Sequence, residues 1–326
     1  MKIILKNNKG LRWYKNSTVY FKGYFYINNT FYEKENALKY LSKINKLTTI
    51  LEEISGSFTI LKKEKESLFV TSDITRSFPI FYTIQNNEFC MSDDIYYLKS
   101  ICNITDFDTY SELELKASNH TYGNKTLLKE VYQIQACECL EIKNNKIENS
   151  CFKYSYAIHK ESNSDYKTLK KQAATAFEKS FKRLIISLDK KTVIIPLSSG
   201  FDSRLIAVML KKNNYKNVIC YTYGKKESFE IETSKKVAKA LGYRWYFIEY
   251  NNNLIDGYLE SKNFKNYVNY AGKLSSMPNL QEYFAVKYLK EKTLIPKNAI
   301  FIPGYAGDIL GGSEYTKNIP ENIKHV

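Results

Sequence analysis

The chain has 326 residues, of which 44% are hydrophobic and 15% aromatic, so it carries enough apolar material for folded cores and is unlike a disordered chain. Its length predicts two domains. The formal net charge of +15 comes from lysines scattered among Asn, Ile and Tyr, which excludes the clustered basic stripe of a nucleic-acid-binding protein. We interpret the excess as solvated surface, or as an attraction for anionic small molecules such as nucleotides or acidic sugars.

Cysteine usage and hydropathy indicate a cytoplasmic protein. The six cysteines form neither CxxC pairs nor a dense disulfide framework, which predicts reduced thiols. No apolar stretch approaches the about 18–20 residues that a membrane helix needs, and the opening MKIILKNNKG lacks the apolar core of a signal peptide. We therefore expect a cytoplasmic protein whose partners include neither a membrane nor a nucleic acid.

The first half of the chain predicts a mostly antiparallel sheet domain. Short β-branched and aromatic runs at residues 18–26, 57–61 and 68–71 alternate with Asn, Gly and Lys clusters, and residues 33–44 are predicted to form a helix. Residues 157–165 are polar. We therefore assign the first domain to residues 1–156 and the second to residues 165–326.

The second half predicts alternating helices and strands. Apolar residues recur at helical spacing from Tyr166 onward. The pattern then predicts strands at residues 192–197, 218–222, 244–248 and 299–302, with helices at 203–213 and 232–241. Such alternation is typical of an α/β fold with a doubly wound parallel sheet, in which ligands bind at the carboxyl ends of the strands.

The most informative segment is SSGFDS, residues 198–203, which lies between a predicted apolar strand and a predicted helix. Small residues let the backbone approach an anion, and consecutive N–H groups, two hydroxyls and the helix N-terminus can donate to phosphate. The segment is neither GxxxxGK(S/T) nor GxGxxG. Asp202 would repel bare phosphate and is better suited to Mg²⁺ on a pyrophosphate. The alternative is a plain serine-rich strand-to-helix turn.

A second cluster, GYAGDILGGS at residues 304–313, also follows a predicted strand and places Asp308 between glycines. Two such loops at one edge of a sheet can bind one Mg–pyrophosphate from opposite sides. Taken alone, this cluster also fits a plain turn.

These two loops resemble those of the PP-loop ATP pyrophosphatases, specifically the asparagine synthase family, and the resemblance covers most of residues 190–315. It implies that a carboxylate attacks the α-phosphorus of ATP, releasing pyrophosphate, and that an amine or ammonia then forms an amide. Asparagine biosynthesis is one candidate pathway. ATP and Mg²⁺ are the implied cofactors, and a small-molecule carboxylate with a nitrogen donor are the implied partners.

The resemblance also implies site residues. Asp202 and Asp308 fall on its metal positions, and Arg204 could assist them catalytically or be a solvated or ion-paired residue. Glu230 matches an acidic position before the next helix, and Ser275 and Ser276 match a substrate-facing turn, although SSMPN also fits a helix start. The implied nucleotide-binding residues are Leu197, Ser198, Ser199, Gly200, Phe201, Asp202, Ser203, Tyr221, Thr222, Tyr223, Pro303 and Gly304. For the tyrosines, ordinary packing is the alternative.

Residues 52–83 and 121–142 resemble the class II glutamine amidotransferase domain of this family, which implies an Ntn-hydrolase-like α+β layout of sheets and helices. Such domains use a cysteine at residue 2, where this chain has Lys2. We therefore expect no glutaminase activity, and a first domain that serves structure or assembly. Free ammonia, a partner protein or a substrate amine would supply nitrogen.

The family's synthase domain continues beyond the second glycine loop, so we expect the second domain to be incomplete at its C-terminus. A protein partner supplying that region, as in a split enzyme, is one consequence. The rival hypothesis is a non-catalytic nucleotide-binding or assembly protein.

Overall fold

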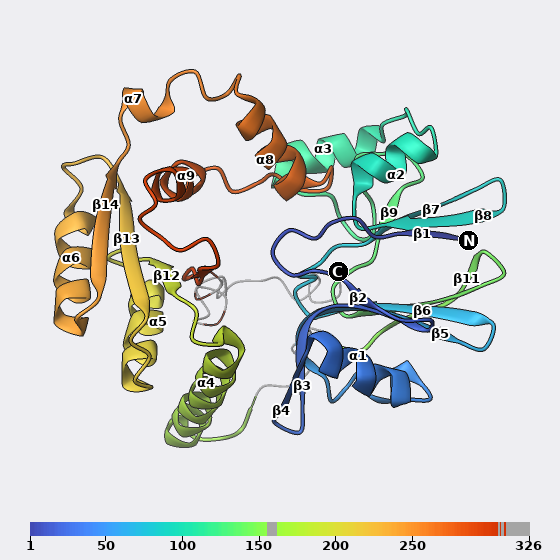
Figure 1. Ribbon diagram of the computed structural model, residues 1–326, viewed down its shortest axis with the longest axis horizontal. Coiled ribbons are helices and arrows are strands. Elements are labelled where there is room, and N and C mark those ends of the chain that lie inside the picture. The colour runs from blue at the N-terminus through green and yellow to red at the C-terminus, as the bar shows by residue number, and fades with distance from the viewer. Residues whose placement is uncertain (155–161, 306, 308–309, 311–326) are drawn as a thin grey trace. The chain divides into compact units, whose positions relative to one another are not determined.

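The computed structural model describes residues 1–154, 162–305, 307 and 310 (Figure 1). Its contacts divide the chain into a first unit, Met1–Ser162 with Leu259–Pro278, and a second unit, Asn163–Tyr258 with the chain from Asn279 onward. The division lies within the polar stretch where the sequence predicted a boundary. The assignment of residues 259–278 to the second domain is corrected, because they pack in the first unit. Each unit is described by itself.

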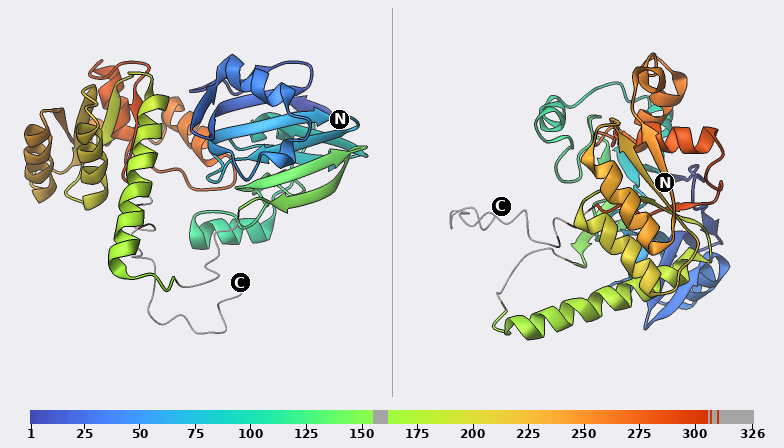
Figure 2. Two further views of the ribbon diagram at one scale, coloured as in Figure 1. Left: turned by 90° about the horizontal axis from the view of Figure 1, so that it is seen from below. Right: turned by 90° about the vertical axis from the view of Figure 1, so that its left-hand side faces the viewer.

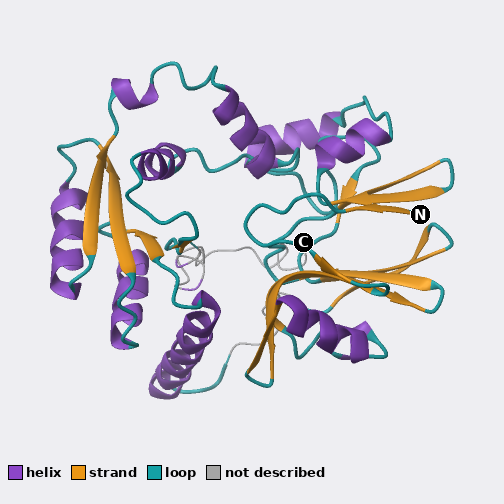
Figure 3. Cartoon of the chain, in the orientation of Figure 1, coloured by secondary structure: helices purple, strands orange, loops and turns teal. Residues whose placement is uncertain are grey.

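The first unit contains two sheets (Figure 3). One has the order β1-β8-β7-β9, formed by Lys2–Ile4, Glu88–Ser92, Phe81–Gln85 and Tyr132–Gln133. The other has the order β11-β10-β6-β5-β3-β2, formed by Lys146–Phe152, Glu138–Lys143, Ser67–Ser72, Ser55–Glu64, Val19–Ile27 and Tyr14–Lys15, with β4 (Thr30–Glu33) also paired to β3. The described pairs are antiparallel except β1 with β8, so the predicted mostly antiparallel domain is confirmed.

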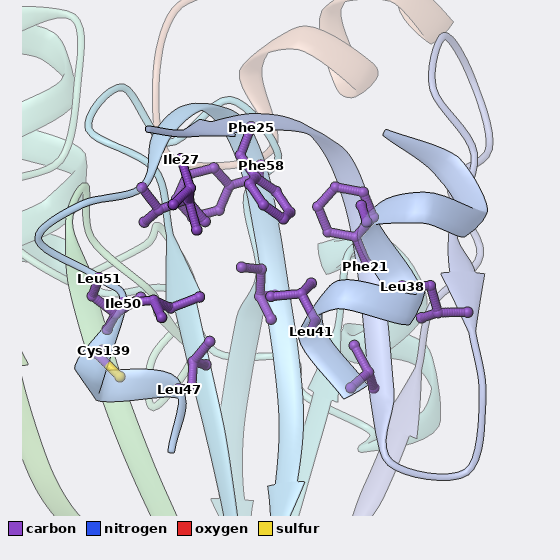
Figure 4. Close-up of a cluster of buried hydrophobic side chains, with 14 residues drawn as sticks. Phe21, Phe25, Ile27, Leu38, Leu41, Leu47, Ile50, Leu51, Phe58 and Cys139 are labelled. Carbon is purple, nitrogen blue, oxygen red and sulfur yellow. The ribbon is translucent and has the colours of Figure 1, made fainter. Parts of the chain in front are cut away.

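Three apolar clusters order these sheets into layers. Phe21, Phe25 and Leu41 belong to the cluster between helix α1 (Lys34–Lys43) and the larger sheet, next to the 3₁₀ turn Leu47–Thr49 (Figure 4). A second cluster, including Val70 and Met91, lies between the two sheets. A third packs α2 (Ile95–Ile101) on the outer face of the smaller sheet. The order is helix, sheet, sheet, helix, because each sheet has an apolar residue set on both faces.

Asparagine pairs close three of the hairpins in this unit. Residues 28–29, 86–87 and 144–145 have positive φ at both central positions, between 49° and 66°. Two consecutive left-handed residues define the type I′ turn, whose twist matches that of the flanking strands. Asparagine tolerates this conformation better than other non-glycine residues, so these Asn-Asn pairs set the register of β3 with β4, β7 with β8 and β10 with β11.

The segment Leu259–Pro278 returns to the first unit through helix α8 (Lys262–Gly272), near α2 and α3 (Thr109–Ser118). The Tyr96 hydroxyl donates to Asn269 Oδ1 at 3.0 Å. Beyond α8 the backbone pairs with residues 119–127, with Leu127 N donating to Leu274 O at 2.8 Å and Thr121 N to Ser275 O at 2.9 Å. These bonds anchor the turn SSMPN in the first unit.

The second unit is built on four parallel strands in the order β14-β13-β12-β15, formed by Arg244–Glu249, Val218–Gly224, Val193–Pro196 and Ile300–Phe301. One face is covered by α4 (Tyr166–Leu188), α5 (Phe201–Lys212) and α6 (Phe229–Leu241), and the other by α9 (Tyr283–Glu291) (Figure 1). A short helix, α7 (Asn252–Ile255), follows β14. Helices on both faces of a parallel sheet confirm the predicted α/β class.

Helix α4 is only partly packed. Figure 2 shows α4 as the long yellow-green helix. Residues 166–180 are exposed, whereas Phe181 and Leu188 near its C-terminal end are buried. Asp165 caps the helix by accepting from Thr168 N at 3.0 Å. The helical period predicted from Tyr166 is therefore correct, although most of its apolar stripe has no core to enter within the second unit.

The strand order of the second unit reverses between β12 and β15. Chain order runs from β12 outward to β13 and β14, and then returns to the other side of β12 with β15. The loops after β12 and β15 therefore leave the sheet at neighbouring strands, and such a reversal opens a crevice at the carboxyl edge of a parallel sheet. The two loops that the sequence singled out are these two.

Candidate active site

A pocket of about 520 Å³ lies at this carboxyl edge of the second unit. This volume is in the range of small-molecule and cofactor sites. The pocket is lined by residues of the two loops, of the ends of β12, β13 and β14, and of the segment that leads into α9: Pro196, Leu197, Ser198, Gly200, Asp202, Ser203, Tyr221, Thr222, Tyr223, Gly224, Glu230, Tyr250, Gln281, Glu282, Pro303, Gly304 and Tyr305.

The first loop folds around two serine hydroxyls. Ser203 Oγ accepts from Ser198 N at 3.1 Å and lies 3.1 Å from Ser198 Oγ. Ser198 Oγ in turn accepts from Gly200 N at 3.1 Å. These bonds tie the end of β12 to the first turn of α5. The loop is thereby held in one compact shape without a lysine to close it.

Helix α5 begins inside the pocket. Gly200 occupies the N-cap in an extended conformation, and Asp202 and Ser203 lie in the first turn. The first N–H groups of a helix have no intrahelical acceptor and carry the positive end of the helix dipole. Together with the loop hydroxyls, they form a donor set suited to phosphate oxygens. The predicted phosphate cradle therefore has its expected position at a strand-to-helix junction.

The second loop packs directly onto this turn. A Cβ atom on Gly304 would lie 2.9 Å from Ser203 N and 3.2 Å from Asp202 Cβ, and one on Gly307 would overlap the carboxylate of Asp202. At Gly304 the obstacle is backbone, so that position needs glycine, whereas a side chain at residue 307 would force the Asp202 carboxylate to move. Gly304 and Gly307 are thus explained by contact with the first loop, which a plain turn would not require.

Thr222 fixes the strand end beside the loop. Its side chain is buried, donates to Leu197 O at 2.7 Å and accepts from the indole Nε1 of Trp245 at 3.0 Å. Leu197 N also donates to Tyr221 O at 2.8 Å. The Thr222 hydroxyl is therefore engaged with protein groups, and its contribution to the pocket is to hold Leu197 in place.

One wall of the pocket is a carboxylate surrounded by tyrosines. Glu282 accepts from the hydroxyl of Tyr305 at 3.2 Å and from that of Tyr221 at 3.5 Å. The Tyr223 and Tyr250 rings are stacked with centroids 4.9 Å apart. Burial raises the pKa of the Glu282 carboxyl, while these two hydrogen bonds oppose the rise. Burial also raises the pKa of Tyr223, to about 12, so this phenol stays neutral at ordinary pH.

Most of the predicted second-unit residues meet in this pocket, but three do not line it. Ser199 directs its hydroxyl to Glu230 Oε1 at 3.0 Å. The Phe201 side chain is 82% exposed, and Arg204 lies over its ring at 4.4 Å while its Nε donates to Gly200 O at 3.1 Å. Arg204 thus contacts its own helix turn and is not among the residues that line the pocket.

Two further predictions have a different outcome. Ser275 and Ser276 belong to the first unit, where the Ser275 carbonyl accepts from Thr121 N, and they are not among the residues that line the pocket. Asp308 lies outside the described residues. Within the described part of the chain, no group of three or more His, Cys, Asp or Glu side chains could hold a metal ion.

The donor set nevertheless fits a nucleotide-borne Mg²⁺. Proteins commonly hold this ion through one or two carboxylates, with substrate phosphates and water completing its ligands. Asp202 supplies one carboxylate at the junction of the two loops. The site therefore suits Mg²⁺ delivered with a phosphate ligand better than a metal held by protein groups alone.

Sequence reasoning missed four pocket residues that bear polar side chains: Tyr250, Gln281, Glu282 and Tyr305. Tyr250 follows the strand Arg244–Glu249 directly, so the rule that ligands bind at carboxyl ends of strands could have found it. Tyr305 lies inside the second glycine loop. Glu282 gave no local signal, because an acidic residue beside an amphipathic helix is ordinary on a surface.

Comparison with known proteins gives one local sequence similarity. No protein-family model matches the chain. Over 63 residues the chain is 40% identical to 7-cyano-7-deazaguanine synthase of Sulfurihydrogenibium sp. (strain YO3AOP1), which is 19% of this chain and 28% of that protein. The chain thus spans little more than a quarter of the length of the curated relative it matches.

Solved structures give weaker likenesses. An NH3-dependent NAD synthetase from Campylobacter jejuni is 17% identical with a TM-score of 0.29, covering 47% of this chain and 62% of that one. A predicted subunit of tRNA methyltransferase from Methanocaldococcus jannaschii is 17% identical with a TM-score of 0.23, covering 40% and 59%. Glutamine phosphoribosylpyrophosphate amidotransferase from B. subtilis is 10% identical with a TM-score of 0.25, covering 78% and 52%. These scores are too low to carry an argument about this chain.

Every helix among the described residues is too short or too polar to cross a bilayer.

Proposed function

We propose that the second unit binds ATP with Mg²⁺ and activates a carboxylate as an acyl-adenylate, releasing pyrophosphate. The observation that carries the proposal is the contact of the two loops at the strand-order reversal, with Asp202 between them. Donors from the first turn of α5 and the Ser198 and Ser203 hydroxyls face the place where charge builds on the leaving pyrophosphate. The 63-residue similarity to a synthase supports an enzyme, and its small extent leaves the substrate open.

The roles follow from position in the pocket. Leu197, Tyr223, Pro303 and Gly304 would hold the nucleoside, since they are at the strand ends on both sides of the first loop. Asp202, with Asp308 as the second ligand expected from sequence, would hold Mg²⁺, which neutralises phosphate charge when bound. Glu230, which lines the pocket, would contact the substrate.

The second half of the proposed reaction is amide formation. Attack of a neutral amine or ammonia on the acyl-adenylate forms the C–N bond, breaks the bond to AMP and releases a proton. Glu282, half-buried and hydrogen-bonded to Tyr305, is the carboxylate suited to receive that proton. The enzyme would then be a carbon–nitrogen ligase of asparagine synthase type, with the first unit as a degenerate Ntn-type amidotransferase domain.

The proposal is tested with the purified chain, ATP, Mg²⁺, ammonium and a pool of carboxylates labelled with ¹⁸O. Adenylate chemistry transfers one labelled oxygen from the carboxylate to AMP. We expect carboxylate-dependent AMP that carries the label, and none from Asp202→Asn. Unlabelled AMP would exclude the acyl-adenylate. Tight ATP binding without turnover would favour the non-catalytic alternative or an enzyme that needs a partner chain.

A further inference from the structure

The first unit contains a basic pocket that the proposed reaction does not use. A cavity of about 270 Å³ lies where the loop after β1 meets β3, the segment before β7 and the end of α8. Its lining residues are Asn7, Lys9, Gly10, Leu11, Trp13, Lys22, Ser77, Phe78, Pro79, Asp93, Tyr270 and Lys273. Five of them, Asn7, Lys9, Asp93, Tyr270 and Lys273, also line an adjoining cavity of about 500 Å³.

Lys22 is the unusual member of this lining. It is 2% exposed, and its Nζ donates to Asn7 O at 2.5 Å and lies 5.3 and 5.8 Å from the Phe78 and Trp13 rings. The pKa of Lys22 is lowered to about 8, mainly by burial; Asp93 opposes the change and Lys273 contributes to it. A buried lysine is costly unless an anion compensates it.

The one buried carboxylate beside these lysines is already engaged. Asp93 accepts from Lys6 N at 2.8 Å, from Asn7 N at 2.9 Å and from the Trp13 indole at 2.7 Å. These bonds fold the loop after β1 over the pocket. Lys9, Lys22 and Lys273 take part in none of the ion pairs found among the described residues.

Further positive charge surrounds the pocket. Lys9 and Lys273 lie 4.8 and 5.6 Å from the centroid of the same ring, Tyr270. Burial lowers the pKa of the half-buried Lys273, Asp93 and Asp94 oppose the change, and Arg76 adds slightly to it. Several cations thus converge on a cavity whose single buried carboxylate is used for folding. An anionic ligand would supply the missing countercharge.

We propose that this pocket of the first unit binds a small anionic metabolite, through its carboxylate or phosphate group, with Lys22 and Lys273 as the principal ligands. The cavity has room for a molecule about as large as an amino acid, and Trp13, Phe78 and Tyr270 offer apolar contact to its carbon skeleton. The first unit would then be a ligand-binding module. This proposal does not depend on the reaction assigned to the second unit.

Isothermal titration calorimetry of the full chain with succinate, with inorganic phosphate and with the neutral analogue succinamide tests the site. We expect one equivalent of an anion to bind and succinamide not to bind. The two anions distinguish a carboxylate site from a phosphate site. Lys22→Met and Lys273→Met should each weaken the affinity by about tenfold or more, as expected for loss of a charged hydrogen bond.

Two variants serve as controls. Lys62 is also a buried lysine of the first unit, 5% exposed, but it lies 3.3 Å from Glu64 Oε1 and lines neither cavity. Lys62→Met should therefore bind the anion like the wild type, as should Asp202→Asn. If Lys22→Met does not fold, as judged by circular dichroism, the Lys273→Met variant tests the proposal, because Lys273 is only half-buried. Binding of neither anion, equal binding by the lysine variants, or loss of binding in Asp202→Asn would overturn the proposal.

Discussion

The carboxylate of Asp202 and the backbone of Gly307 are in such close contact that a Cβ atom on residue 307 would overlap it. Residue 202 lies in the first turn of α5, after the first strand of the second unit, and residue 307 follows the last strand. Two loops separated by about a hundred residues therefore meet at one acidic side chain. The proposed role of Asp202 as a Mg²⁺ ligand depends on this contact.

Gly307→Ala should displace the Asp202 carboxylate. We expect carboxylate-dependent pyrophosphate release to fall by about a hundredfold, because a misplacement of about 1 Å at a reacting centre has that effect. Stability should change little, since the second loop lies at the surface of the sheet edge. Gly272→Ala is the matched control, because a Cβ there would make an ordinary 3.5 Å contact with Pro278 Cδ. Equal activity of both variants would contradict the assigned role of Gly307.

The two neighbouring serines of the first loop should differ in effect. Ser198 Oγ accepts from Gly200 N and contacts Ser203 Oγ, whereas Ser199 Oγ is directed to Glu230. Ser198→Ala should therefore lower pyrophosphate release by about tenfold or more, and Ser199→Ala should leave it within a few-fold of the wild type. Steady-state kinetics with saturating ATP separates the two. A larger loss in Ser199→Ala would mean that this hydroxyl, and not that of Ser198, serves the phosphates.

Glu282→Gln should separate the two halves of the reaction. Carboxylate activation should persist, while amide formation falls by about a hundredfold or more, as expected for loss of a general base. Only the ionised carboxyl can accept a proton, and burial raises its pKa. Amide formation in the wild type should therefore fall with decreasing pH, starting above the ordinary range of a glutamate. This acidic limb should be missing in Glu282→Gln, and its persistence would assign the titration to another group.

The buried lysine of the first unit predicts a pH-dependent stability. The folded pKa of Lys22 is lowered from 10.5 to about 8. The unfolded lysine therefore binds a proton that the folded one lacks between these values, and stability rises with pH across that window. Relative to Lys22→Met, the wild type should gain at most about 3 kcal/mol between pH 8 and 10.5.

Urea titrations of both proteins across this range measure the difference. The titratable groups facing Lys22 are Asp93, Lys9, Lys273 and Tyr270, and those groups remain in both proteins. A flat difference for Lys22→Met would show that the lysine is not desolvated.

Local patterns predicted the second unit well. The spacing of apolar residues predicted the bounds of five elements to within a few residues, because each element buries a regular apolar face. These elements are β12, β13, β14, α5 and α6. The segment 198–203 also falls at the predicted strand-to-helix junction, since small residues there have no packing alternative. The sequence predicts these features because they depend on residues that are close together along the chain.

Tertiary contacts set what the sequence could not reveal. Residues 259–278 join the first unit through backbone hydrogen bonds to residues 119–127, which leave no compositional mark. The turn at Ser275 therefore pairs with residues of the first unit, and the expected helix start is absent there, since α9 begins only at Tyr283. Glu282 enters the pocket because α9 covers one face of the sheet, and its tyrosine partners come from distant segments. The spacing of residues along the chain does not reveal such long-range contacts.

The measurement that tests the central claim most directly is ³¹P nuclear magnetic resonance of ATP and Mg²⁺ incubated with the chain, ammonium and the carboxylate pool. We expect resonances of AMP and pyrophosphate that grow only with carboxylate present and are lost in Asp202→Asn. Formation of ADP and inorganic phosphate, or equal turnover in Asp202→Asn, would contradict the central claim, because neither outcome uses the two loops to hold a leaving pyrophosphate.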